Sequence, residues 1–195
     1  MPSGKDGLAS RWTVLLAGLQ SGVLGGFAML VWLSILSVWN GRSIWAPWNL
    51  FASTFFGESA LRRGLRWSTL SGASLHLFLA GVLGILFGLG VSGIASRWRV
   101  RLLGLLVAVL WNTLWFGSLW KRLNPFMALY GPDSGLMIAH LALGYFLGSF
   151  PRYRRRLEAE PVPEVVEAAA PLELPEPADE AQPPPSPAQE AAPPE

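Results

Sequence analysis

The sequence predicts an all-α protein, a four-transmembrane-helix bundle with a disordered C-terminal tail. Of its 195 residues, 51% are hydrophobic and only 14% are charged, whereas soluble domains usually carry about 25% charged residues. The charges are also divided along the chain: all fifteen Lys and Arg residues lie within residues 1–156, and ten of the thirteen acidic residues follow. These observations exclude an ordinary soluble domain and indicate a basic membrane core followed by an acidic, solvated tail.

Four segments are long and apolar enough to cross a hydrocarbon core about 30 Å thick. Helices are the expected form, because in lipid each backbone amide must find a partner within its own segment. The first segment is too long for the apolar region of a cleavable signal peptide, so we expect it to be retained. The expected parts are a short cytoplasmic N-terminus at 1–11 and a membrane domain at 12–150, with spans at about 12–38, 70–95, 102–120 and 134–151.

Basic residues near the span ends predict the orientation, because cytoplasmic loops carry an excess of Lys and Arg. With the N-terminus inside, nine basic residues flank the inner ends of the spans and six flank the outer ends. We therefore expect a multi-pass protein of the inner membrane with both termini in the cytoplasm. The lipid bilayer is the expected partner, with acidic headgroups rather than nucleic acid facing the basic residues. The main anchor is the juxtamembrane segment 151–156, with Arg152, Arg154, Arg155 and Arg156.

The first external loop carries an amphipathic pattern of its own. Pro47 suits the first turn of a helix, and Asn49 and Ser53 fall away from the apolar face. We expect an interfacial helix lying on the outer surface; a loop packed over the mouth of the bundle is the alternative. The apolar residues follow i, i+4, i+7, i+11 spacing: Ile44, Trp48, Phe51 and Phe55.

The tail, residues 157–195, differs in composition from the rest of the chain. It is rich in Pro, Glu and Ala and contains no aromatic residue. A segment with so few apolar side chains and one sign of charge cannot bury enough surface to offset the entropy of ordering. We expect it to be disordered.

Small residues recur at four-residue spacing on the expected helices. Such faces let two backbones approach closely, so that dispersion holds helices together where lipid removes the hydrophobic driving force. We expect a tight bundle, with a homo-oligomer or a neighbouring membrane protein as its protein partner. The packing residues are Gly18, Gly22 and Gly26 on the first span, Gly84 and Gly88 on the second, and Gly144 and Gly148 on the fourth.

Three polar residues, His76, Asn112 and His140, fall on these stripes at similar depths. Ionisable residues inside a membrane are candidates for function. The two imidazoles suit the axial ligands of a b-type haem, and a quinone or proton site needs only hydrogen-bonding groups. The simpler interpretation, which we favour, is that the three residues bond one another or backbone carbonyls and fix the register of the helices. No metal is expected, because two His and one Asn make a poor ligand set.

No catalytic motif is recognisable in the chain. The absence of cysteine excludes disulfides, thiolate metal sites and cysteine nucleophiles, and no Walker, dinucleotide-binding or zincin pattern occurs. We therefore expect a non-enzymatic membrane protein of structural, assembly or accessory type, without a cofactor. The alternative is a small carrier, channel or redox subunit, with b-type haem or a quinone, built around His76 and His140.

The chain also resembles a group of small bacterial four-span membrane proteins of unknown function, over residues 14–150. This resemblance implies the four-span fold, and it implies no activity and no catalytic residue. The residues that carry it are Trp45, Asn49 and Leu50 after the first span, His76 and Gly84 on the second, Gly104 on the third, and Ala139, His140, Leu141 and Gly144 on the fourth.

Overall fold

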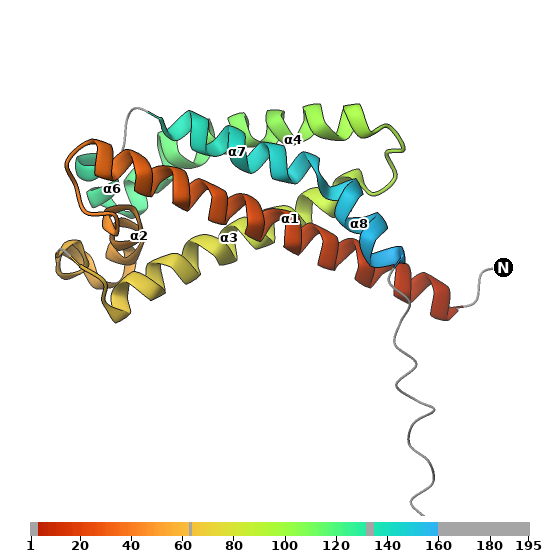
Figure 1. Ribbon diagram of the computed structural model, residues 1–195, viewed down its shortest axis with the longest axis horizontal. Helices are drawn as coiled ribbons and strands as arrows, with labels where there is room; N and C mark the ends of the chain where they lie inside the picture. Colours follow the sequence, from red (N-terminus) through yellow and green to blue (C-terminus); the bar gives the residue numbers. More distant parts are fainter. Residues whose placement is uncertain (1–3, 63, 132–134, 160–195) are drawn as a thin grey trace, which may run out of the picture. The chain divides into compact units, whose positions relative to one another are not determined.

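A computed structural model describes residues 4–62, 64–131 and 135–159, and every regular element in these ranges is helical (Figure 1). The predicted all-α fold is confirmed for this part of the chain. The elements, in order, are α1 (Gly4–Trp39), α2 (Ala46–Phe56), the 3₁₀-helix η1 (Gly57–Leu61), α3 (Trp67–Val91), α4 (Arg97–Trp111), the π-helical η2 (Asn112–Leu119), α5 (Trp120–Leu123), α6 (Pro125–Tyr130), α7 (Leu136–Gly148) and α8 (Phe150–Ala159).

Within the described part of the chain, two helices are long and apolar enough to cross a membrane: residues Arg11–Trp39 of α1, and α3. The other two expected spans are interrupted. The segment expected at 102–120 passes from α4 into a π-helical stretch, in which the wider turn breaks the regular hydrogen bonding. The segment expected at 134–151 ends as a helix at Gly148, because Pro151 cannot donate a backbone hydrogen bond and the chain restarts as α8.

The boundaries of the remaining segments also differ from the expected ones. α1 begins at Gly4, so most of the expected N-terminal segment 1–11 is helical. α8 converts the juxtamembrane segment 151–156 into a helix and extends it to Ala159. The rest of the tail, residues 160–195, lies outside the described residues.

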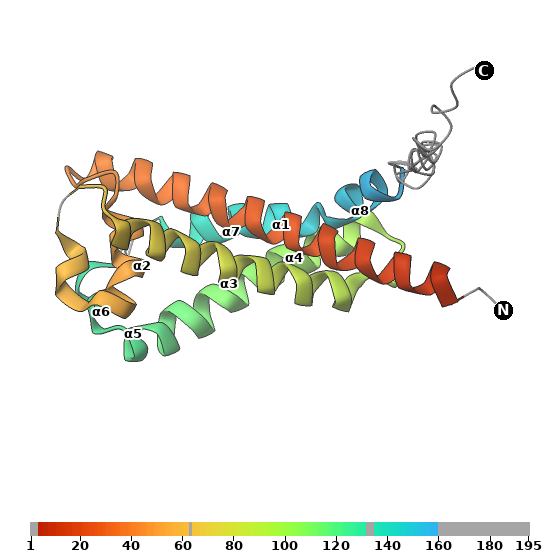
Figure 2. The same ribbon diagram turned by 90° about the horizontal axis from the view of Figure 1, so that it is seen from below.

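The long helices pack side by side around α1. α1 contacts α3 on one side and α7 on another, and α4 packs on α7 (Figures 1 and 2). At one end of this bundle α2 lies across α3 and contacts α6, whereas α8 packs on α1 at the opposite end.

Glycines bring α1 and α3 into backbone contact. A Cβ atom on Gly18 would lie 2.7 Å from the carbonyl oxygen of Gly84, closer than real Cβ atoms approach other atoms. Gly22 rests in the same way on the carbonyl group of Ala80. Small residues therefore allow close packing without large interdigitating side chains.

The same kind of contact joins α4 to α7. A Cβ atom on Gly104 would lie 2.6 Å from the carbonyl oxygen of Gly144, and one on Gly148 would lie 2.8 Å from the Cα atom of Arg101. The stripe residue Gly88 instead faces the ring of Phe150 at the start of α8. Two close helix pairs thus form the bundle, and α1 and α7 join them.

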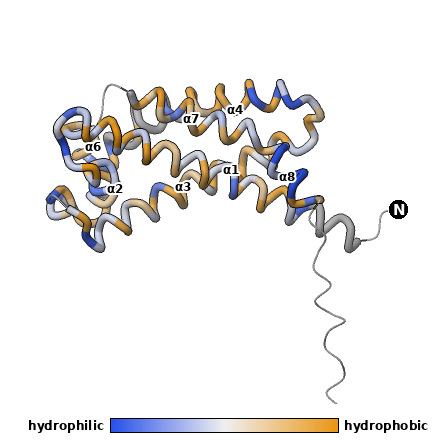
Figure 3. Tube along the Cα trace, viewed as in Figure 1, coloured by the Kyte–Doolittle hydropathy of each residue, from blue (hydrophilic) through white to orange (hydrophobic). Residues whose placement is uncertain are grey.

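Large apolar side chains cover the outside of the bundle. Phe27, Phe78, Leu86 and Tyr145 are all exposed, and Phe78 keeps 67% of its surface accessible. Along the long helices, apolar residues lie in the middle and hydrophilic residues lie towards the two ends (Figure 3). Large apolar residues thus lie on the exterior as well as in the core, and small residues occupy the closest helix contacts.

We predict that Gly22→Ala lowers the free energy of unfolding by about 1–3 kcal/mol, the usual cost of overpacking. The new methyl group would meet the backbone of Ala80, which cannot move aside without separating α1 from α3. Denaturation in mixed detergent micelles measures the effect. The matched control is Gly90→Ala on α3, where a Cβ atom meets open space and stability should stay equal or rise. Equal stability of the two variants would contradict the close contact.

Candidate functional site

His76 joins α3 to α1 and to α2. Its Nε2 atom donates to the carbonyl oxygen of Gly26 at 3.0 Å, and its ring lies 4.5 Å from the ring of Phe51, centroid to centroid. The side chain is buried among these three helices. His76 is thus placed to hold the three helices in one register.

His140 and Asn112 have different partners. His140 is fully buried, and its Nδ1 atom donates to the carbonyl oxygen of Leu136 on its own helix at 2.9 Å. The Oδ1 atom of Asn112, at the start of the π-helical stretch, is buried and accepts no hydrogen bond from the described residues. The two imidazoles thus each bond to a main-chain carbonyl, His76 across a helix interface and His140 within its own helix.

The described residues contain no set of three His, Cys, Asp or Glu side chains that could hold a metal ion. A haem bound through His76 at Nε2 would have to displace the hydrogen bond to Gly26. The observed geometry therefore suits helix packing better than axial ligation.

We predict that His76→Leu costs about 1 kcal/mol in the free energy of unfolding, the scale of hydrogen bonds between membrane helices, and that His140→Leu, which removes a bond within α7, costs less. Because the two rings bond to different carbonyls, the double variant should lose roughly the sum of the two. Denaturation of the wild type, the two single variants and the double variant in detergent gives the four free energies of this double-mutant cycle. A double variant no less stable than one single variant would show a shared network instead.

A cavity of about 910 Å³ lies at the α2 end of the bundle, and the sequence did not predict it. It is lined by the last turns of α1, by α2 and η1, by α6, and by Leu136 at the start of α7. Its larger apolar lining residues include Leu33, Leu36, Leu50, Phe51, Met127 and Leu136. Its charged and amide-bearing lining is Asn40, Arg42, Asn49, Glu58 and Arg62.

Asn49 fastens one wall of this cavity. Its Nδ2 atom donates to the carbonyl oxygens of Arg62 at 3.1 Å and Gly64 at 3.3 Å, and its Oδ1 atom accepts from the hydroxyl of Thr69. The Thr69 hydroxyl in turn accepts from the backbone N–H of Arg66 at 3.0 Å. Asn49 is only 2% exposed, so this network ties α2 and the segment after η1 to the start of α3.

Asn124 fastens the opposite end of α2. Its Nδ2 atom donates to the carbonyl oxygen of Leu50 at 3.3 Å and to the hydroxyls of Ser53 at 2.9 Å and Thr54 at 3.1 Å. Its Oδ1 atom accepts from the backbone N–H of Phe126 at 3.0 Å, which caps α6. The pair Asn-Pro is a typical helix start, so the cap was readable from the sequence although its contact with α2 was not.

α2 differs from the amphipathic helix that the sequence predicted. A helix is present, but Asn49 and Ser53, expected to face away from its apolar side, are buried. Of the expected apolar face, Phe51 is buried, whereas Phe55 is 63% exposed and Ile44 is exposed too. Hydrogen bonds to the neighbouring loops draw the two polar side chains inward, and they outweigh the simple separation of apolar from polar residues.

Two further contacts complete the rim. Arg42 donates from Nη1 to the carbonyl oxygen of Tyr130 at 3.1 Å, which joins the turn after α1 to the end of α6. The indole N–H of Trp32 donates to the carbonyl oxygen of Gly135 at 2.9 Å. The first and last long helices are thereby connected beside the cavity.

Comparison with known proteins gives no functional assignment. No family model, no curated protein and no solved structure matches the chain significantly. The resemblance to four-span proteins therefore stays a prediction from the residues.

We predict that Asn49→Leu lowers the free energy of unfolding by about 2–4 kcal/mol, because Thr69 and the carbonyls of Arg62 and Gly64 lose their partner together. Hydrogen exchange should rise in residues 57–66 before it rises elsewhere. The matched control is Asn40→Leu in the turn after α1, where the exposed amide bonds to the carbonyl oxygen of Leu36 one turn earlier. Similar protection in both variants would show that Asn49 does not hold the wall.

Proposed function

We propose that the chain is an integral membrane protein in which α1, α3, the segment α4–η2–α5 and α7 each cross the bilayer. The observation that carries this proposal is the distribution of side chains, with small residues between the helices and large apolar residues on the outside. A soluble bundle would not expose so many large apolar side chains along its helices.

The burial of the two longest helices supports a lipid environment. Only 50% of the most apolar window of α1, and 44% of that of α3, is buried within the protein. A core helix of a soluble protein is mostly buried, so an apolar helix that is half exposed requires a nonpolar surrounding. Residues Arg11–Trp39 span roughly 43 Å at 1.5 Å per residue, which exceeds a hydrocarbon core of about 30 Å.

The third and fourth spans are supported by their packing. α4 lies on α7 through Gly104 and Gly144, in the same close manner in which α1 lies on α3. Leu106 on α4 and Tyr145 on α7 are exposed on the outside, where lipid would contact them. Because α7 also packs on α1, the second pair shares the depth of the first.

The charged residues lie at the two ends of the helices, as a bilayer requires (Figure 3). Arg152, Arg155 and Arg156 on α8 are exposed and are the proposed contacts with acidic headgroups. Arg154 is partly used within the protein, since its Nε atom pairs with Glu158 at 2.8 Å and its Nη1 atom donates to the carbonyl oxygen of Ser92 at 3.0 Å. We propose that this end faces the cytoplasm.

We infer a structural, assembly or accessory role rather than an enzymatic one. The buried polar groups His76, Asn49 and Asn124 all bond to main-chain carbonyls that hold helices or loops together. Such bonds serve the architecture and leave no activated side chain among them. The cavity favours a second candidate, a binding protein for a small molecule, because its volume falls within the usual range of ligand sites, about 300–1,000 Å³.

We predict that single cysteines at positions 59 and 129 label with a membrane-impermeant maleimide in intact cells, and that those at 96 and 155 label only after permeabilisation. The chain has no native cysteine, so the background is absent. Ser59, Ser96, Leu129 and Arg155 are all exposed, so burial does not prevent their reaction.

The labelling pattern distinguishes a wrong membrane arrangement from a wrong orientation. Positions 59 and 96 test the span of α3, and positions 129 and 155 test whether α7 crosses the membrane. Labelling of all four positions in intact cells would contradict the membrane proposal. The opposite accessibility at every position would contradict only the orientation.

A further inference from the structure

We infer that the cavity at the α2 end binds an anionic amphipath, a molecule with an alkyl chain and a phosphate or carboxylate headgroup. The inference deepens the proposed membrane function and rests on it for the place of the cavity at the bilayer surface. It is carried by three features of the described residues: the apolar inner wall, the arginines at the rim and the hydrogen bonds that hold the wall in place.

The inner wall suits an alkyl chain. Leu33 and Leu36 from α1, Leu50 and Phe51 from α2, and Met127 from α6 line this wall. Leu33, Leu50, Phe51 and Met127 are nearly fully buried in the protein. An alkyl chain that lies against this wall moves from water or the headgroup region to an apolar surface. This transfer favours binding by about 0.8 kcal/mol per buried methylene.

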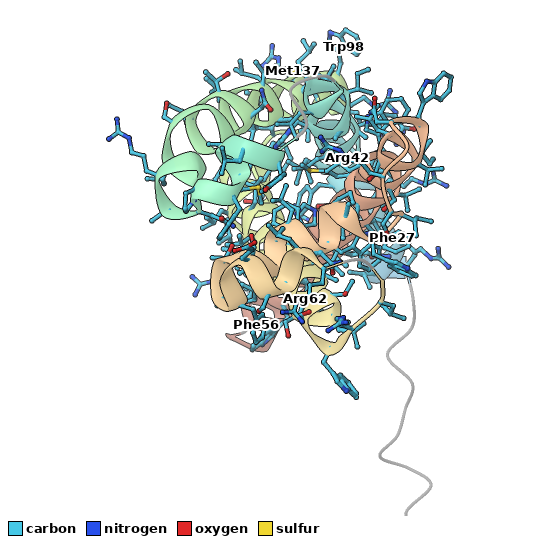
Figure 4. All side chains as sticks on the ribbon, turned by 90° about the vertical axis from the view of Figure 1, so that its left-hand side faces the viewer. Phe27, Arg42, Phe56, Arg62, Trp98 and Met137 are labelled. Carbon is cyan, nitrogen blue, oxygen red and sulfur yellow. The ribbon has the colours of Figure 1, made fainter. Side chains whose placement is uncertain are left out.

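The rim suits an anion. Arg42 and Arg62 line the cavity together with one carboxylate, Glu58. Among the described residues the only ion pair joins Arg154 to Glu158 on α8, so neither rim arginine is neutralised by a carboxylate in this part of the chain. Figure 4 looks onto this end of the bundle, with Arg42 and Arg62 labelled.

The geometry of the guanidinium group further limits which headgroups suit the site. Arg42 uses its Nη1 atom for the carbonyl oxygen of Tyr130, and a guanidinium carries five N–H donors in all. The remaining donors form a planar fork that matches the oxygens of a phosphate or carboxylate. Because Tyr130 holds the side chain of Arg42, little of its rotamer entropy remains to be lost on binding.

The cavity is formed before a ligand arrives. Asn49 fixes the backbone of Arg62 from one side of α2, and Asn124 fixes Leu50 from the other. Both amides are nearly inaccessible, with Asn124 only 1% exposed. A site whose walls are tied in this way does not have to order itself on binding, which preserves affinity.

The place of the cavity matches the depth of a lipid headgroup. It lies where α1 ends and α7 begins, which is the level of the membrane surface if these helices cross the bilayer. Two sources share the chemistry: a bilayer phospholipid with an anionic headgroup, and a free fatty acid or alkyl phosphate. The experiment has an arm for each.

The test titrates dodecyl phosphate into the full chain in nanodiscs of zwitterionic lipid, followed by calorimetry against empty nanodiscs. We expect one saturable site in addition to linear partitioning into lipid. Inorganic phosphate lacks the chain and should bind at least about tenfold more weakly. Dodecyltrimethylammonium carries the opposite charge and should show partitioning only.

Variants locate the site. Arg42→Gln and Arg62→Gln should each weaken the binding of dodecyl phosphate by about three- to fivefold, as expected for one partly exposed charge pair. The matched control is Arg99→Gln on α4, an exposed arginine at the opposite end of the bundle, which should bind normally. Ala46→Phe, which fills part of the cavity from α2, should abolish the saturable component, with the unfolding midpoint recorded to confirm folding.

Changing the lipid composition of the nanodisc distinguishes a bilayer phospholipid from a free amphipath as the ligand. If a phospholipid occupies the cavity, phosphatidylglycerol in the nanodisc competes with dodecyl phosphate, and native mass spectrometry retains it on the wild type more than on Arg42→Gln. If it does not compete, the free amphipath is the ligand. Partitioning alone, or equal binding by the wild type and the Arg42→Gln/Arg62→Gln double variant, overturns the inference.

The failure of this inference is distinguishable from failure of the membrane proposal. A protein that labels at its introduced cysteines as predicted and still shows no saturable site contradicts the ligand alone. A protein that binds dodecyl phosphate saturably, but whose cysteines contradict the spans, contradicts the membrane arrangement alone.

Discussion

The backbone contact between α1 and α3 is the constraint on which the other parts of this structure depend. It requires glycine or alanine on both helices, as at Gly18, Gly22, Ala80 and Gly84. Once the two axes lie this close, the side chains beside the contact are also brought together. His76 then reaches the carbonyl oxygen of Gly26 across the interface, and α2 rests on the first turns of α3.

The two ends of the bundle are built by different means. At the cavity end, short elements are joined mainly through the amides of Asn49 and Asn124 and through the indole of Trp32. At the other end, α8 returns onto α1 and holds Ser92 through Arg154. The first end contains the cavity and the second presents a basic helix. We associate recognition of a molecule with the cavity end and attachment to a charged surface with the basic end.

The local sequence pattern was enough to predict the helical fold, but only a small part of the candidate site could be predicted from it. Glycine spacing is a local property, and the helical period alone places Gly18, Gly22 and Gly26 on one face. Pro151 indicates that a helix should end near Gly148. The apolar residues around it nevertheless favoured one continuous span, so the break was not predicted. The inward turn of Asn49 depends on carbonyls at residues 62 and 64, and the cavity depends on residues as distant in sequence as Leu33 and Leu136. Such combinations depend on tertiary contacts, which no local window of the sequence contains.

The hydrogen bond from Trp32 to Gly135 joins residues that are 103 positions apart in the chain. During synthesis the first helix therefore emerges long before the group that accepts its indole proton. Contacts of long sequence separation form late, and the cavity wall that includes Leu33 also includes Leu136. That wall therefore stays incomplete during synthesis until the start of α7 has been made.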